Sequence, residues 1–258
     1  MRRQMGAALA VGAMLAVAIG GTARASGETP EWWECVKAKG VGTLDKGCAG
    51  EGGKGGYIAR PAPGGAAFRG HGLFTMGNVQ CASGIEATEE PPNLLIGVAI
   101  RFSSCHRRSN TKYHCQAQEE KGGPKEPRFE SEPLSGELGY ISRSPLRVGL
   151  RLVNAAEPGG GITPRIYCIG PADHFRFAGS LVGEVGGVVN VAGKKGTLDY
   201  VPIEDPGHPL TWVDPPLEGE ELGLFRQQPE VSEESWGPGV ETAAEATVRI
   251  QGAQMIKA

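Results

Sequence analysis

The sequence predicts an all-β protein of antiparallel strands, arranged as a β-sandwich or an irregular β-barrel-like sheet and stapled by disulfides. Short apolar runs that alternate with polar residues recur along the chain, a pattern typical of strands with one buried face. The 41 glycines and 19 prolines follow no collagen-like period and indicate many tight turns. No segment has a convincing amphipathic helix pattern, and residues 34–40 are the one marginal helical candidate.

The first residues have the pattern of a secretory signal peptide. Arg2 and Arg3 precede an apolar run over residues 6–21, and the small residues Ala23 and Ala25 follow it. A membrane-spanning helix needs about 20 apolar residues, and this run is shorter. We therefore expect cleavage after Ala25, so that residues 1–25 are removed.

The remaining residues, 26–258, are expected to form a single secreted β-rich domain. No later run is apolar enough to span a membrane, so no transmembrane segment is expected after cleavage. Cleavage removes three of the 26 basic residues and leaves 23 against 29 acidic ones, a net charge of about −6. This charge argues against a nucleic acid as the partner, because nucleic-acid-binding domains are usually clearly basic.

Eleven segments have strand character, and several alternate cleanly. Over residues 146–153, for example, Val148 and Leu150 fall on one face while Arg147 and Arg151 fall on the other. The expected strands are 57–60, 72–76, 78–83, 94–102, 137–142, 146–153, 165–169, 175–185, 187–191, 196–201 and a final strand within 246–258.

Two segments interrupt the strands. Residues 106–128 are expected to form a basic hairpin that runs into a glycine–proline loop. Residues 202–242 hold seven prolines and ten acidic side chains against one base, Arg226, and predict an acidic, proline-rich excursion from the sheet. Such a segment is usually a solvated loop, although its charge could also attract cations or a basic partner.

The cysteines predict a disulfide framework. Their number is even and all follow the signal peptide, which in an exported chain favours three disulfides. Close spacing favours two local bridges and leaves one long one, so the expected pairs are Cys35–Cys48, Cys105–Cys115 and Cys81–Cys168.

A zinc site is the alternative for part of this framework. Cys105, His106, His114 and Cys115 form a near-palindrome of plausible ligand types. Their spacing matches no zinc motif, and export favours oxidation over thiolate ligation. We therefore expect no metal and no other cofactor.

Trp32 and Trp33 precede the first cysteine. If the segment is extended, their side chains point to opposite faces. One ring would then pack inward beside the Cys35–Cys48 bridge, and the other would stay at the surface as a possible contact for a sugar or a protein.

The order of short motifs is also informative. The stretches EWWEC, VQCAS, a strand that ends in a cysteine hairpin, PLSGELGYI, YCIG and a terminal MIKA follow one another. This order resembles a family of secreted six-cysteine proteins from soil actinobacteria that has no assigned activity. The resemblance covers most of residues 31–200 and the last dozen residues, and 202–242 are less like the family. It implies export and the six-cysteine framework, and it supplies no functional residues.

No catalytic motif stands out. The chain has no G-x-S-x-G elbow, no H-E-x-x-H helix and no phosphate-binding loop. The neighbours Asp173 and His174 are the most catalytic-looking pair, but adjacent residues on a strand face apart. The sequence thus favours a non-enzymatic extracellular or cell-envelope protein that binds a partner, such as an envelope glycan or another protein, or serves as a structural component. The alternative is a secreted carboxylate-dependent hydrolase acting on a polysaccharide.

Overall fold

The computed structural model is all-β. It describes residues 29–38, 42, 44–48, 56–118, 123–170, 173–190, 192–200, 224–228, 240–242 and 244–258, and no helix occurs in these ranges. The expected signal peptide over 1–25 lies outside them. The fifteen strands are β1 (Glu31–Lys37), β2 (Tyr57–Pro61), β3 (Ala67–Met76), β4 (Val79–Glu90), β5 (Leu94–Arg107), β6 (Asn110–Ala117), β7 (Arg128–Glu130), β8 (Leu134–Arg143), β9 (Leu146–Asn154), β10 (Ile166–Cys168), β11 (Asp173–Gly186), β12 (Gly193–Tyr200), β13 (Leu224–Gln227), β14 (Val240–Thr242) and β15 (Ala244–Lys257).

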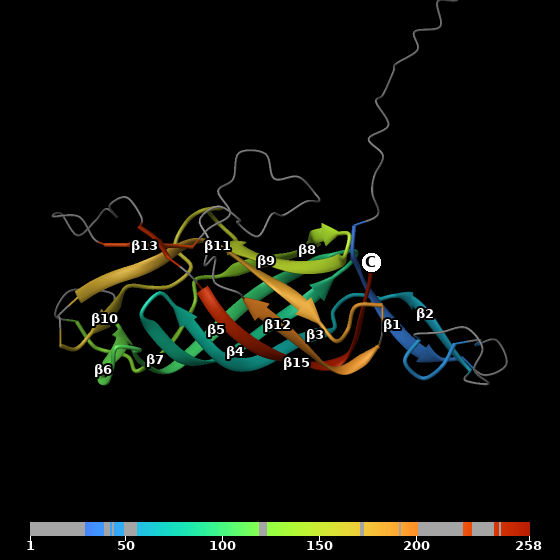
Figure 1. Ribbon diagram of the computed structural model, residues 1–258, viewed down its shortest axis with the longest axis horizontal. Coiled ribbons are helices and arrows are strands. Elements are labelled where there is room, and N and C mark those ends of the chain that lie inside the picture. The colour runs from blue at the N-terminus through green and yellow to red at the C-terminus, as the bar shows by residue number, and fades with distance from the viewer. Residues whose placement is uncertain are drawn as a thin grey trace, which may run out of the picture.

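Eight of the strands close into a ring. The pairing runs β3–β4–β5–β8–β9–β11–β12–β15 and returns from β15 to β3, and every pair is antiparallel. The strands follow chain order around the ring, so the fold is an up-and-down barrel with insertions between some neighbours (Figure 1). The predicted all-β antiparallel class is confirmed, and the pairing selects the barrel-like arrangement.

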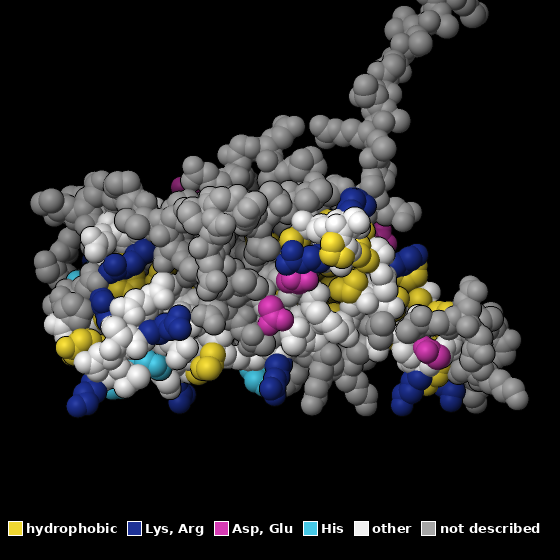
Figure 2. Space-filling model, viewed as in Figure 1, with side chains coloured by type: hydrophobic (Ala, Val, Ile, Leu, Met, Phe, Trp, Pro, Cys, Tyr) yellow, Lys and Arg dark blue, Asp and Glu magenta, His cyan; other side chains and the backbone are white. Residues whose placement is uncertain are grey.

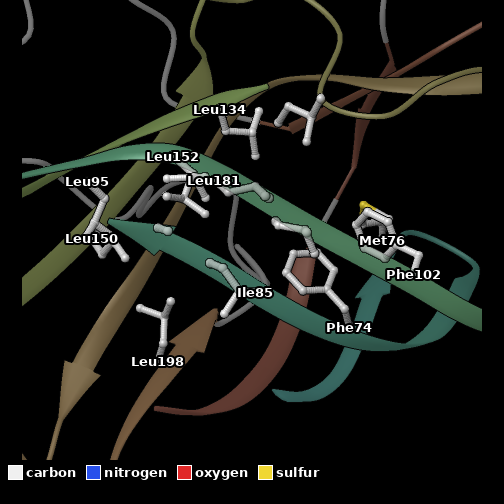
Figure 3. Close-up of a cluster of buried hydrophobic side chains, with 14 of the residues drawn as sticks. Phe74, Met76, Ile85, Leu95, Phe102, Leu134, Leu150, Leu152, Leu181 and Leu198 are labelled. Atoms are coloured by element: carbon white, nitrogen blue, oxygen red, sulfur yellow. The ribbon is translucent and has the colours of Figure 1, made fainter. Parts of the chain in front are cut away.

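The barrel interior is filled by apolar side chains. An eight-stranded barrel leaves an interior about wide enough for side chains to fill. Phe74, Phe102, Leu95, Leu150 and Leu152 are all at most 1% exposed. Side chains from several strands meet in this cluster, as Figure 3 shows. Full burial of each such side chain stabilises the fold by about 1.5–3 kcal/mol relative to exposure.

Strand β3 shows how the sequence produces both faces of the wall. Phe68 and Phe74 are buried in the interior, whereas Arg69 and His71 between them are exposed. Gly77, with φ of 54°, begins the two-residue turn to β4, because a glycine accepts this conformation without steric cost. The predicted strands over 72–76 and 78–83 are therefore one hairpin.

One end of the barrel is covered by the N-terminal strands. Strand β1 pairs with both β15 and β2, and it includes residues 34–37, so this part of the marginal helical candidate 34–40 is a strand. Trp32 is 2% exposed. Its Nε1 donates to the Leu94 carbonyl oxygen at 3.0 Å, and its ring meets Phe68 edge-on at 6.0 Å between centroids. Trp32 thus packs against the β4–β5 end of the wall.

A smaller sheet extends from the other end, in the order β6–β10–β11–β13–β14 (Figure 1). Strand β11 belongs to both sheets. Its residues 176–179 pair with β13, and its residues 180–184 pair with β9 in the barrel. The long strand therefore anchors the smaller sheet to the barrel wall.

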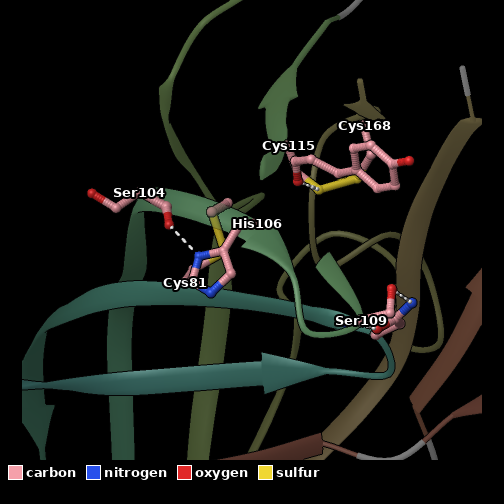
Figure 4. The surroundings of a disulfide bond; sticks show 9 residues. Cys81, Ser104, His106, Ser109, Cys115 and Cys168 are labelled. Atoms are coloured by element: carbon pink, nitrogen blue, oxygen red, sulfur yellow. Dashed lines mark hydrogen bonds between the residues drawn. A yellow bond between two sulfur atoms is a disulfide. The ribbon is translucent and has the colours of Figure 1, made fainter. Parts of the chain in front are cut away.

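The disulfides correct two of the three expected pairs. Cys35–Cys48 is confirmed, but the other bridges are Cys81–Cys105 and Cys115–Cys168, not 105–115 and 81–168 (Figure 4). No free cysteine remains.

The reason for the correction is the course of β5. A bulge at Ser104, with φ of 52°, interrupts the β4–β5 pairing opposite Cys81. The extra residue turns Cys105 toward the buried side, where it lies 4.1 Å in Cα–Cα distance from Cys81. Cys115 lies directly opposite Cys168 in the β6–β10 pairing. The sequence spacing could not reveal these cross-strand neighbours.

Two further expectations differ from the structure. Residues 187–190 form no strand, although Val189 makes an isolated bridge to Ile256. The acidic segment 202–242 is not entirely outside the sheet, because it contains β13 and β14, and the rest of it lies outside the described residues. The expected basic hairpin is confirmed, because β5 and β6 pair antiparallel with His106 opposite His114. Strand β7 begins at Arg128, the last residue of that segment.

The new pairing predicts the outcome of peptide mapping. Digestion under non-reducing conditions is expected to give linked peptides for Cys81–Cys105 and Cys115–Cys168. Replacing both members of the Cys115–Cys168 bridge with serine should lower the free energy of unfolding by about 4 kcal/mol, because a bridge over 53 residues constrains the unfolded chain strongly. A peptide that links Cys105 to Cys115 would contradict the structure.

Strand β15 predicts a second result. Deleting residues 246–258 removes the strand between β12 and β3 and opens the ring, so the truncated protein should lose its cooperative thermal transition. The measurement is a melting curve followed by circular dichroism. A truncated protein with an unchanged melting temperature would show that ring closure is dispensable.

Candidate binding surface

The outer face of β15, β3, β4, β5 and β7 carries a cluster of cationic side chains. In an antiparallel pair, residues directly opposite each other point to the same face of the sheet. The register gives three adjacent rows, which run Leu73–Ala82–Ser103–Arg128, Arg249–His71–Gly84–Arg101–Glu130 and Arg69–Glu86–Ala99. We call these three rows the basic face.

The charged side chains of the basic face are exposed. Arg69 and Arg101 are 67% and 58% exposed, and Arg128 and Arg249 are also exposed. The rows hold four arginines against two glutamates, a net charge of +2 without the histidine. The chain as a whole carries −3, so the remainder of the chain carries −5. The three rows are therefore net positive on a protein whose remainder is net negative.

The two glutamates are both engaged by arginine. Arg101 Nη1 donates to Glu86 Oε2 at 2.9 Å, and Arg101 Nε donates to Glu130 Oε1 at 2.5 Å. Arg69 lies farther from Glu86, at 3.9 Å from Nε to Oε1. The hydrogen bond to Glu130 and the charge of Glu86 raise the pKa of Arg101 above its usual value. These pairs orient Arg101 along the surface, and exposed pairs of this kind add little to stability.

The centre of the basic face is built from small residues. Ala82 and Gly84 on β4 lie between larger side chains on β3 and β5. A Cβ atom added to Gly84 would meet nothing closer than the Gly70 carbonyl oxygen at 3.8 Å. The outward side chains in the middle of β4 therefore extend less far from the sheet than the histidine and arginine side chains on β3 and β5.

Histidines and further basic residues continue the basic face toward the β5–β6 hairpin. His106 pairs with Gln80 on one side and with His114 on the other, so both histidines lie one row beyond Leu73. His106 Nδ1 lies 3.1 Å from the Ser104 carbonyl oxygen (Figure 4). Lys112 is exposed near the tip of this hairpin. Figure 2 shows Lys, Arg and His side chains along the lower edge of the molecule, where β4, β7 and β15 run in Figure 1.

The structure separates the two tryptophans. Trp32 is buried, so it is the inward ring of the pair and not a surface contact, and it packs on Phe68. Trp33 is half-buried. Its Nε1 donates to Glu31 Oε2 at 3.0 Å, and Lys257 Nζ lies 4.1 Å from the centre of its ring. Since Lys257 covers that ring, Trp33 is a poor platform for a partner.

The other sequence candidates do not form a site. Cys105 and Cys115 are oxidised in separate bridges, so the zinc alternative loses both thiolates. In the described ranges, no group of three or more His, Cys, Asp or Glu side chains is placed to hold a metal ion. His174 packs against Tyr167, with 4.8 Å between ring centroids, and Lys125 Nζ lies 4.2 Å above the Tyr167 ring. The contact with Tyr167 gives His174 a packing role that requires no catalytic function.

Sequence reasoning missed the basic face. Arg69 and His71 alternate with glycine in RGHGL, and Arg101 follows a strand-like run, which identifies outward positions one strand at a time. Their convergence depends on the β15–β3–β4–β5 register, which no single segment contains. A search for alternating basic residues in consecutive strands could have suggested it.

One buried carboxyl group lies at the covered end of the barrel. Glu89 is 3% exposed and follows Ile85 and Ala87 on the inward side of β4. Burial raises the pKa of the Glu89 carboxyl from 4.5 to about 7. A pKa in this range suits a general acid, but a side chain with so little exposure cannot meet a polymer outside the barrel.

Comparisons with known proteins add no assignment. The chain matches no protein-family model, no curated protein and no solved structure. The resemblance to secreted six-cysteine proteins therefore stays a prediction. Within the described part of the chain, no helix has the length and hydropathy needed to cross a membrane.

Glu89 predicts a pH-dependent stability. Its folded-state pKa exceeds the unfolded value, so the folded state holds the proton more tightly. The contribution is greatest below pH 4.5, declines as pH rises from about 4.5 to about 7, and is constant above that. The loss should be at most about 3 kcal/mol, since one pKa unit corresponds to 1.36 kcal/mol.

Denaturant unfolding of Glu89→Gln between pH 4 and 8 checks this prediction. The variant should lack the decline, whereas Glu86→Gln, an exposed glutamate of the same strand, should keep it. An unchanged pH profile in Glu89→Gln would show that another group is responsible.

Proposed function

We propose that the protein is a secreted, non-enzymatic binding or structural protein of the extracellular space or cell envelope, and that the basic face is its contact surface. The observation that carries the proposal is the concentration of exposed cations on one side of a barrel whose interior is filled. A filled interior favours an outer surface as the place of binding, because apolar side chains occupy the space that a small ligand would need.

The disulfides support the proposed location. Three bridges with no free cysteine are consistent with an oxidising compartment. The charged start and short apolar run of residues 1–25 further support export. A barrel with disulfides in its wall and in the attached sheet suits a protein that works outside the cell, where it must stay folded without chaperones.

The carboxylate-dependent hydrolase is the competing function. Such an enzyme places one carboxyl group to donate a proton and a second to attack or activate water. On the basic face, Glu86 and Glu130 both bind Arg101, which favours a role in ion pairs over acid–base chemistry.

Binding and turnover assays on the purified mature protein, residues 26–258, separate these functions. A glycan array and sedimentation with cell-envelope fractions are expected to show binding, and a panel of polysaccharides assayed for new reducing ends is expected to show no turnover. Turnover that disappears when a single Glu or His is replaced would overturn the proposal. Absence of binding to every envelope fraction and glycan would also count against it.

A further inference from the structure

We infer that the basic face binds a linear acidic polysaccharide, which lies across β15, β3, β4 and β5 over Gly84. The inference rests on the proposed function and adds the chemical class of the ligand and its place. Four features of the basic face support it, namely its length, its charge distribution, its central depression and its low apolar content.

The length of the basic face suits a polymer. Strands lie about 4.8 Å apart, so the row from Arg249 through His71, Gly84 and Arg101 to Glu130 spans about 19 Å over its four gaps. Cationic groups occur on both sides of Gly84 in this row. A ligand with anionic groups repeated along its length could meet several of them at once, whereas a single small anion could meet only one or two.

Further cations flank this row. Arg128 lies in the row toward the β5–β6 hairpin, and Arg69 lies in the row on the opposite side. Adjacent rows are two residues apart along a strand, or about 7 Å. A polymer that crosses the strands therefore has an arginine beside it in both directions.

The low centre at Ala82 and Gly84 gives the polymer a path. Side chains on β3 and β5 rise on each side of β4, and a Cβ at position 84 would have no neighbour within 3.8 Å. A sugar chain can approach the backbone there while its anionic groups reach Arg101 and Arg249.

The composition of the face favours a polysaccharide over a protein partner. The fully buried core of a protein interface is apolar and depleted in charge. In the three rows, Leu73 is the one large exposed apolar side chain, and its neighbour on β4 is the small residue Ala82.

The test uses retention on immobilised polygalacturonate, a carboxylated polysaccharide, with dextran as the neutral matrix. Wild-type protein is expected to bind polygalacturonate at 20 mM salt, to be released well below 1 M, and not to bind dextran, because salt screens exposed charges. Gly84→Glu adds a carboxylate in the centre, at a position where an added Cβ meets no atom closer than 3.8 Å, and should weaken binding at least tenfold. Arg101→Ala combined with Arg249→Ala should have a similar effect.

Arg60→Ala is the matched control. Arg60 is 58% exposed, as is Arg101, and it also pairs with a glutamate, but it lies on β2 at the covered end of the barrel. This variant should bind within twofold of wild type, and melting temperatures of all variants establish that they are folded.

The outcomes separate this inference from the proposed function. Retention on envelope fractions without retention on polygalacturonate or on dextran sulfate, the sulfated form of the neutral matrix, would overturn the inference alone. Equal binding by folded Gly84→Glu would also overturn it. So would binding to poly-glutamate or duplex DNA as tight as that to the polysaccharide, which would indicate another class of partner. Release of reducing ends from bound polygalacturonate would overturn the non-enzymatic proposal instead.

Discussion

Closure of the strand ring by β15 is the constraint on which the rest of the structure depends. The last strand of the chain fills the position between β12 and β3, so every barrel strand has a hydrogen-bonded neighbour on both sides. An open sheet would expose two edges and could not enclose a core. Closure also makes the interior a single apolar cluster, to which strands far apart in sequence contribute Phe74, Leu150 and Leu198.

Closure also determines the outer surface. Because side chains alternate along each strand, a register that places Phe68 and Phe74 inside must place Arg69 and His71 outside. The same register brings Gly84 and Arg101 into line with them. The packing of the core and the position of the cations are thus two results of one hydrogen-bonding pattern, and no separate element is needed to build the basic face.

The sequence was informative wherever local pattern decides the structure. The alternation at Val148, Leu150 and Leu152 identified a real strand, although Arg151, expected on the opposite face, is buried as well. Non-local pairing was not accessible, because the bulge at Ser104 reverses the direction of Cys105 and the partner of Cys115 lies on β10, 53 residues away. The basic face was missed for the same reason, since its residues come from five strands. For the two tryptophans, alternation correctly predicted that their side chains lie on opposite faces, but it could not indicate that Trp32 is the buried one.

The sharing of β11 between two sheets has a mechanical consequence. A strand that slips by one residue against a neighbour turns all its side chains to the opposite face. Because β11 is continuous, such a slip beside β10 or β13 would force the same slip beside β9. Cys168 fixes β10 to β6 covalently, and β10 forms a hairpin with β11. A disulfide outside the barrel therefore helps to fix the register of β11 against its barrel neighbour β9.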